Sequence, residues 1–264
     1  MPITPDPRAV PVEDHFVSLF AAIRSPRFEH HPDTDVTVYT SEVAHPLCNG
    51  ALSARFGDDA EARTEAVLDR LIALGRPFQW WCGPASISPQ LEAVLARRGL
   101  VGGAENPGMH LDLTSTTLPA ADADIRRCSS PDEHRAATAT FLAGFDVSLD
   151  LLDDFDDMLQ SVPTTSDQQM TVLHAFVDDE PAGTGMVAAI GGVAGLYNIA
   201  VLPHARNKGL GAAITLELLR AGANAGCAKA ILHASGMGFP VYRSLGFETV
   251  CEVQSHIWLP PADG

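Results

Sequence analysis

One short stretch in the second half of the chain combines glycines with positive charge. In Arg206-Asn-Lys208-Gly209-Leu-Gly211, two basic side chains precede two glycines, and a helical pattern follows over 209–225. Glycines let backbone N–H groups converge, and the N-terminus of a helix adds partial positive charge. In a chain with a net charge of −16, this is the densest positive charge in its half. The stretch is therefore predicted to bind a pyrophosphate.

Two common phosphate-binding motifs, the Walker A loop and the dinucleotide-binding GxGxxG turn, do not describe this stretch. It resembles the Arg/Gln-x-x-Gly-x-Gly/Ala loop of the GCN5-related N-acetyltransferase (GNAT) family. Downstream, Ser235-Gly-Met-Gly-Phe-Pro-Val-Tyr242-Arg-Ser-Leu-Gly246-Phe247 resembles the family's Asn/Ser…Tyr-x-x-x-Gly-Phe segment. The two motifs occur in the family's order, and the resemblance covers about residues 123–259.

The resemblance implies an α/β (α+β) fold with a mixed, mostly antiparallel sheet flanked by helices, and acetyl-CoA as cosubstrate. In such enzymes the strand predicted here at 195–202 splays from the strand at 228–234, and the pantetheine arm pairs with the exposed backbone of the former. Ser235 is among the residues that the resemblance implies in binding acetyl-CoA, but a role in capping the following helix explains this serine equally well. The residues implied in binding acetyl-CoA are Ala200, Val201, Leu202, Arg206, Asn207, Lys208, Gly209, Leu210, Gly211, Ala212 and Ser235.

Tyr242 is implied as the general acid that protonates the departing CoA thiolate. A phenol with a pKa of ~10 can donate a proton to the thiolate of a thiol with a pKa of ~8.5 without first being charged. The alternative is that the Tyr242 ring only packs within the last helix. The match to the family position favours catalysis.

The general base is less evident, because the strand at 195–202 offers Tyr197 and Asn198 where many relatives have a glutamate. A water relay is expected instead, with His233 or His174 as possible participants. A single histidine near a strand is more often a structural group, so that interpretation stays open for both.

The second half is expected to supply the elements that position these residues. The sequence predicts strands at 125–128, 170–177, 183–190, 195–202 and 228–234, a strand region at 247–259, and helices at 131–143, 209–225 and 238–245. Gly191-Gly192 is expected to form a hairpin turn, which argues against a membrane span in the uncharged stretch 181–203. The acidic segment 146–157 could attract a cationic amine, or could be a solvated helix face with Leu149, Leu152 and Phe155 inward.

The first half repeats part of this order. Strands are predicted at 35–41, 50–55, 78–82 and 100–113, and helices at 59–75 and 88–98. A glycine follows a predicted helix in each half, at Gly99 and at Gly246, and the residues ten positions later are Met109 and His256 in the last strand of each half. This shared spacing indicates either a duplication or a coincidence. If the half is a GNAT-like repeat, it is degenerate, because Leu95 stands where Tyr242 does.

The linker before the first-half helix at 59–75 differs from the phosphate-binding loop. It has a single glycine, and its Asp58, Asp59 and Glu61 would repel a pyrophosphate. This half is expected to act as a scaffold and as a wall of the acceptor groove. Trp80 and Trp81 could line that groove, although core packing is the more common role of such residues.

These patterns predict a degenerate GNAT-like domain at 1–115, a linker at 116–122 and a catalytic domain at 123–264. The charge of −16 argues against nucleic acid and anionic membranes as partners. Five scattered cysteines and an N-terminus unlike a signal peptide fit a cytoplasmic protein with no metal site.

The predicted activity is transfer of an acetyl group from acetyl-CoA to a small-molecule or peptide amine, by a monomer or a homodimer. The alternatives are a non-catalytic acyl-CoA-binding or regulatory module and a transferase that uses a longer acyl-CoA. The sequence leaves the acceptor unidentified.

Overall fold

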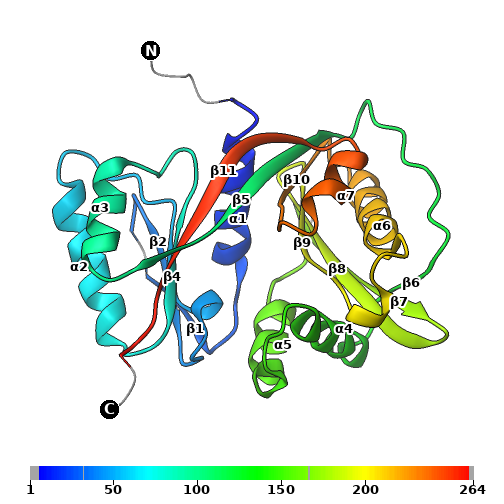
Figure 1. The fold of residues 1–264 in the computed structure, drawn as a ribbon, viewed down its shortest axis with the longest axis horizontal. Helices are drawn as coiled ribbons and strands as arrows, with labels where there is room; N and C mark the ends of the chain where they lie inside the picture. Colours follow the sequence, from blue (N-terminus) through cyan, green and yellow to red (C-terminus); the bar gives the residue numbers. More distant parts are fainter. Residues whose placement is uncertain (1–5, 32, 166, 262–264) are drawn as a thin grey trace.

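A sheet of 11 strands runs through the molecule and joins its two halves (Figure 1). The computed structural model describes residues 6–31, 33–165 and 167–261, and all counts refer to these residues. The sheet is mixed and mostly antiparallel, with helices on its faces, as the sequence predicts.

The first half of the chain supplies three helices and five strands. α1 (Val10–Ala22) precedes the hairpin of β1 and β2, and α2 and α3 follow β3 and β4. The remaining bounds are β1 (Phe28–His31), β2 (Thr37–Ser41), β3 (Gly50–Leu52), α2 (Ala60–Ala73), β4 (Phe78–Cys82), α3 (Pro89–Arg97) and β5 (Val101–Asp112).

The second half supplies four helices and six strands. Ser130 begins α4 (Pro131–Gly144) with a capping box, in which its side chain and that of Glu133 bond each other's backbone N–H. The other bounds are β6 (Asp124–Arg127), α5 (Leu152–Gln160), β7 (Gln168–Val177), β8 (Glu180–Ile190), β9 (Val193–Val201), α6 (Leu210–Asn224), β10 (Lys229–His233), α7 (Phe239–Ser244) and β11 (Glu248–Trp258).

The last strand of each half pairs with the sheet of the other half. In the order β1-β2-β3-β4-β11-β5-β10-β9-β8-β7-β6, β11 lies against β4, and β5 lies against β10. Figure 1 shows these two long strands crossing the middle of the molecule side by side. The two halves therefore share one central sheet.

The pairing of β5 with β11 is symmetric about one residue pair. Gly99 and Gly246 are 147 positions apart, and so are Asn106 and Val253, which face each other across the two strands. Gly102 pairs with His256, and Met109 pairs with Thr249. These two pairs are equivalent, because Thr249 and His256 lie 147 positions after Gly102 and Met109. A local two-fold axis therefore passes between Asn106 and Val253.

The same symmetry relates the strands next to the centre. Gly50 and Gly195 are 145 positions apart, and so are Ser53 and Asn198, which both have positive φ, at 51° and 55°. Ala51 pairs with Trp80 as Leu196 pairs with Leu232. Of the two interpretations of the sequence repeat, this correspondence supports duplication.

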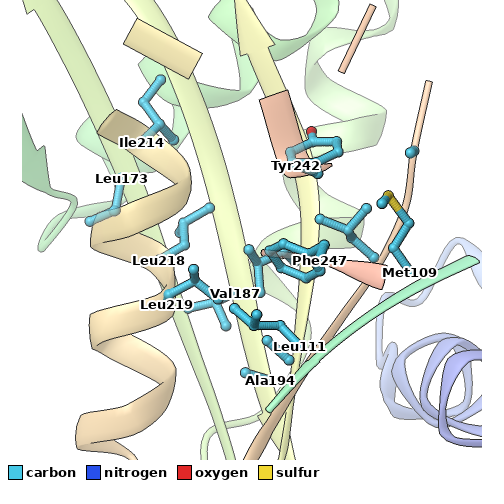
Figure 2. Close-up of a cluster of buried hydrophobic side chains, with 14 of the residues drawn as sticks. Met109, Leu111, Leu173, Val187, Ala194, Ile214, Leu218, Leu219, Tyr242 and Phe247 are labelled. Carbon is cyan, nitrogen blue, oxygen red and sulfur yellow. The ribbon is translucent and has the colours of Figure 1, made fainter. Parts of the chain in front are cut away.

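Two groups of helices cover opposite faces of the second-half sheet. On one face, α6 and α7 pack around a cluster that includes Leu218, Leu232 and Tyr242 (Figure 2). On the other face, α4, α5 and α1 pack around a cluster that includes Phe20, Phe141 and Phe155. α1 thus belongs to the first half in sequence but also covers strands of the second half.

Most predicted elements are present within a few residues of their expected bounds. Gly191 and Gly192 have φ of 57° and 77° and form the predicted hairpin turn between β8 and β9. Within the part of the chain that the structure describes, no helix has the length and apolarity to cross a bilayer. The sequence reasoning missed α1 and β1.

The acidic segment packs only partly as expected. Phe155 is buried, but Leu149 is 55% exposed, so the expected inward position of Leu149 is wrong. Two of the aspartates contact the first half, because Asp154 pairs with Arg27 and Asp157 accepts a hydrogen bond from Ser25. The segment therefore helps to join the halves.

Candidate active site

The strands β9 and β10 run parallel and then part. Their pairing ends at Leu196 and Leu232, while β9 continues to Val201. The edge of β9 beyond Leu196 therefore lacks β10 as a partner, which is the opening expected from the sequence. Ala200 and Val201 lie along it, and Leu202 follows. Such an edge can accept an extended ligand as an added strand.

A bulge marks the start of this opening. β9 has one residue more than β8 between the pairs Met186–Tyr197 and Thr184–Ala200, and Asn198 has a φ of 55°. The extra residue shifts the alternation of side chains by one position. As a result, Tyr197 packs on the α4–α5 face, while Ile199 packs on the α6 face.

The glycine-rich stretch leads into α6 as the sequence predicts. Gly209 is the N-cap residue with a φ of 80°, and Asn207 also has a positive φ, at 61°. The amides of the first turn of a helix have no partner inside it, so those of Leu210, Gly211 and Ala212 are available to an anion. A Cβ at position 211 would meet only Val201, at 3.7 Å, and one at position 209 would meet no atom within 4 Å.

The two basic side chains of this stretch lie differently. Arg206 Nε donates to the carbonyl of Val201 at 3.0 Å, and its Nη2 donates to the carbonyl of Gly144 at 3.3 Å. The guanidinium therefore fixes the loop against β9 and α4. Lys208 is exposed, and no ion pair of it occurs among the described residues.

Tyr242 lies on the α6 face of the sheet. It is 8% exposed, and its ring packs edge-on against Phe247 at 6.0 Å. Figure 2 shows its hydroxyl at the end of the ring that points away from Phe247 and Met109. Burial raises the pKa of Tyr242 to about 12, so the phenol keeps its proton at neutral pH.

His233 is the last residue of β10 and lies on the opposite face. Its ring contacts Phe16 at 5.0 Å and Trp81 at 6.1 Å, so it faces α1 and the first half. Burial lowers the pKa of His233 to about 4, and its Nε2 is buried with no hydrogen-bond partner among the described residues. The structure thus places the two predicted catalytic residues on opposite faces of the sheet.

The other residues singled out in the sequence have local partners. Ser235 Oγ accepts a hydrogen bond from the N–H of Gly238 at 3.2 Å, as the capping interpretation expects. His174 Nε2 is hydrogen-bonded to Thr140 at 2.9 Å, under α4. Trp80 is fully buried in the first-half core, whereas Trp81 lines a pocket next to His233.

Sequence reasoning missed two residues of α1 that reach this region. His15 Nδ1 and the hydroxyl of Tyr197 are 2.8 Å apart, and Glu13 lines the pocket beside His233. Glu13 is only 6% exposed although its side chain ends in a carboxyl group. A carboxylate in a mainly apolar helix is the signal that could have pointed to it.

Comparison with known proteins finds one family model that matches most of the second half. Residues 135–247 match the model of the acetyltransferase (GNAT) family. No curated protein matches the chain.

Solved structures resemble almost the whole chain. A GCN5-related N-acetyltransferase from Kribbella flavida is 18% identical, with a TM-score of 0.71 over 97% of this chain and 96% of that one. A tandem GNAT protein from the clavulanic acid biosynthesis pathway is 14% identical, with a TM-score of 0.57 over 96% of each chain. A GCN5-related N-acetyltransferase from Sphaerobacter thermophilus is 13% identical, with a TM-score of 0.53 over 85% of this chain and 80% of that one. These likenesses show a shared fold that extends over both halves.

Proposed function

We propose that the chain is an N-acetyltransferase, because residues 135–247 match the model of the GNAT family, whose fold supports acyl transfer from acyl-CoA. It moves an acetyl group from acetyl-CoA to a primary amine by direct attack in a ternary complex. The observation that carries this proposal is the parting of β9 from β10 after Leu196 and Leu232, next to the open amides at the start of α6.

The proposed acetyl-CoA site uses the elements that meet at this opening. The backbone of Ala200, Val201 and Leu202 pairs with the pantetheine arm, and the pyrophosphate rests on the amides from Asn207 to Ala212. Arg206 hydrogen-bonds to the carbonyls of Val201 and Gly144 and so holds the glycine-rich loop in place. Its proposed role is to position this loop. Lys208 is exposed beside these amides, where its positive charge favours the phosphates.

The proposed chemistry needs a proton to be delivered on one side of the opening and removed on the other. The amine nitrogen bonds to the thioester carbonyl carbon, and the carbon–sulfur bond then breaks. Tyr242 donates its proton to the departing thiolate, since the raised pKa keeps the phenol protonated. His233 lies on the opposite face, where a neutral imidazole can accept the proton that the amine loses.

We also propose a division of labour between the halves, with catalysis in 123–264, a linker at 116–122 and a scaffold in 1–115. The first-half loop before α2 carries Asp58 and Asp59 at the position of the phosphate-binding amides, which opposes a second acetyl-CoA site there. The first half instead contributes α1 to the face on which the amine approaches.

The test is an assay of CoA thiol release with acetyl-CoA and longer acyl-CoA donors. The acceptors are an alkyl amine, an amino acid, an amino sugar and a peptide with a free N-terminus, and the acylated product is identified by mass spectrometry. Amine-dependent release with acetyl-CoA supports the proposal. Binding of acetyl-CoA without transfer to any of these amines would favour a non-catalytic acyl-CoA-binding module.

A further inference from the structure

The ring of Phe16 on α1 lies across the point where β9 and β10 part. The pairing of these strands ends at Leu196 and Leu232, so Tyr197 and His233 are the first residues beyond it. The ring of Phe16 contacts both of their rings, with centroid distances of 6.0 Å to Tyr197 and 5.0 Å to His233. One side chain of the first half therefore bridges the inner end of the opening on the α1 face.

Phe16 is held in this position by its neighbours. Its ring packs edge-on against Trp81 at 5.1 Å and against Phe20 at 4.9 Å. The helix also lies close to the sheet here, because a Cβ at position 195 would clash with the ring of His15. That ring is hydrogen-bonded to one backbone carbonyl of β8 and one of β9. These contacts fix the Phe16 ring at the opening.

Very little free space lies on the other side of the Phe16 ring, toward the first half. Phe16 is one wall of a cavity of about 10 Å³, which is at the lower limit for one water-sized group. The cavity is also lined by His233 and by residues at the ends of β3 and β4, among them Leu52 and Trp81. An acyl chain that lengthened in this direction would therefore need the space that the Phe16 ring fills.

The proposed direction of acetyl-CoA brings the acyl group to this end of the opening. The pyrophosphate rests at the start of α6, which follows β9 in the chain, and the pantetheine arm runs back from Leu202 to Ala200. The arm thus points toward the place where the two strands meet. Its thioester comes last, next to Tyr197 and His233. We call this end of the opening the acyl site.

The other face of the sheet is filled at the acyl site. The side chains of Leu196 and Leu232 belong to the buried cluster that α6 and α7 cover, and they are 2% and 1% exposed (Figure 2). Additional methylene groups on this face would have to displace side chains that are already packed. An acyl chain longer than acetyl must therefore extend toward Phe16.

We propose that Phe16 closes the acyl site and limits the donor to a two-carbon acyl group. This inference rests on the proposed function, because it concerns the acyl donor of the same reaction. It gives α1 of the degenerate half a direct part in the choice of donor, whereas the residues that bind the pantetheine arm and the pyrophosphate belong to the second half. A propionyl or butyryl group would collide with the phenyl ring.

The experiment compares acetyl-CoA, propionyl-CoA and butyryl-CoA on the full-length protein in two ways. Isothermal titration calorimetry without an amine gives the Kd of each thioester, so that this readout does not depend on turnover. The ratio of the kcat/KM values of two donors is then measured with the same amine acceptor. Because the acceptor is unchanged, this ratio reports the donor preference.

In the wild type, the Kd of butyryl-CoA is expected to exceed that of acetyl-CoA by at least about tenfold, because one methylene group in an apolar site is worth about 10–200-fold. Phe16→Ala should remove this difference, since it empties the space of the ring. Phe16→Leu is a milder change that keeps an apolar side chain against α1 and the sheet. It should admit propionyl-CoA, and it tests the inference even if Phe16→Ala does not fold.

Phe28→Ala is the matched control. It removes a buried phenyl ring from the cluster against which Phe16 packs, but the ring of Phe28 contacts Tyr39 and His30 and lies on β1. This variant should keep the preference for acetyl-CoA even where it lowers the free energy of unfolding. The same loss of preference in Phe28→Ala as in the Phe16 variants would contradict a specific role of Phe16.

Two further results would overturn the inference. One is an equal Kd for acetyl-CoA and butyryl-CoA in the wild type, and the other is an unchanged donor preference in both Phe16 variants. The proposed function fails in a different way, through acetyl-CoA that binds but is not transferred to any amine. In that case the Kd values still decide the role of Phe16. Absence of acetyl-CoA binding would refute both proposals.

Discussion

Tyr197 of β9 and His15 of α1 share a hydrogen bond of 2.8 Å between the phenol oxygen and Nδ1, although 182 positions separate them. His15 Nε2 lies 3.0 Å from the carbonyl of Ala188 and 3.2 Å from that of Val193. Both carbonyls can only accept, so Nε2 carries the proton and Nδ1 accepts from Tyr197. The bond ties the first half to the strand that opens toward the cosubstrate.

Tyr197→Phe is expected to lower the free energy of unfolding by about 1–3 kcal/mol, because it leaves His15 Nδ1 buried without a donor. Urea unfolding monitored by tryptophan fluorescence measures the change. Tyr39→Phe is the matched control, since the Tyr39 hydroxyl is buried and has no hydrogen-bond partner among the described residues. Equal losses in the two variants would contradict a stabilising role for the Tyr197–His15 bond.

Acetyl-CoA at a hundredfold excess over its Kd is expected to stabilise the wild type by about 2.7 kcal/mol. For a chain of this size that corresponds to a Tm increase of about 5–10 °C. Gly211→Glu should abolish the increase, because it places a carboxylate beside the amides proposed for the pyrophosphate, and its Cβ meets only Val201, at an ordinary contact distance of 3.7 Å.

The matched control for this experiment is Gly57→Glu. Gly57 lies in the first-half loop before α2, and a Cβ there would meet no atom within 4 Å. This variant should keep the full response to acetyl-CoA. Loss of the response in both variants, or in neither, would argue against the α6 site.

Tyr242→Phe is expected to reduce kcat by about 10²–10⁴, the usual contribution of general acid catalysis. The Tm increase caused by acetyl-CoA should persist, because the ring and its packing against Phe247 are retained. Since the pKa of Tyr242 is about 12, deprotonation of the phenol should not limit the rate between pH 7 and 10. Unchanged kcat in the variant would show that Tyr242 is a packing residue.

His233 is expected to make the fold sensitive to acid. Burial lowers its pKa from 6.5 to about 4, so between these values the unfolded state binds more protons than the folded state. The contribution of neutral His233 to the free energy of unfolding is therefore fully present above pH 6.5. It is lost as the pH falls toward 4, which lowers the free energy of unfolding by up to about 3 kcal/mol.

His233→Phe should remove this part of the pH dependence, since a phenyl ring can occupy the space between Phe16 and Trp81. Urea unfolding of both proteins at several pH values from 4 to 7 measures the difference. Parallel curves for the wild type and the variant would contradict the assignment.

The sequence was sufficient for the elements of the second half, because their signals are local. Ser130 and Pro131 mark the start of α4, and Gly209 marks the start of α6, which extends over Leu210–Asn224 where 209–225 was predicted. The positions of the loop and of Tyr242 followed from two motifs that each span fewer than 15 residues.

Features that depend on distant residues could not be predicted. The exchange of β5 and β11 joins strands from different halves of the chain, and no local pattern encodes that choice of partner. α1 is apolar along most of its length, because it packs against strands of both halves, so it shows little helical periodicity. For the same reason Glu13, 220 positions from His233, was not associated with it.

The exchange of strands also affects the order in which the molecule can be completed during synthesis. β4 has β11 as its neighbour on one side, and β5 lies between β11 and β10. A nascent chain that ends before Lys229 contains β5 with neither neighbour, and one that ends before Glu248 leaves an edge of β4 open. Unpaired edges invite association with other chains. The first half, although made first, can finish its sheet only when the last strand has left the ribosome.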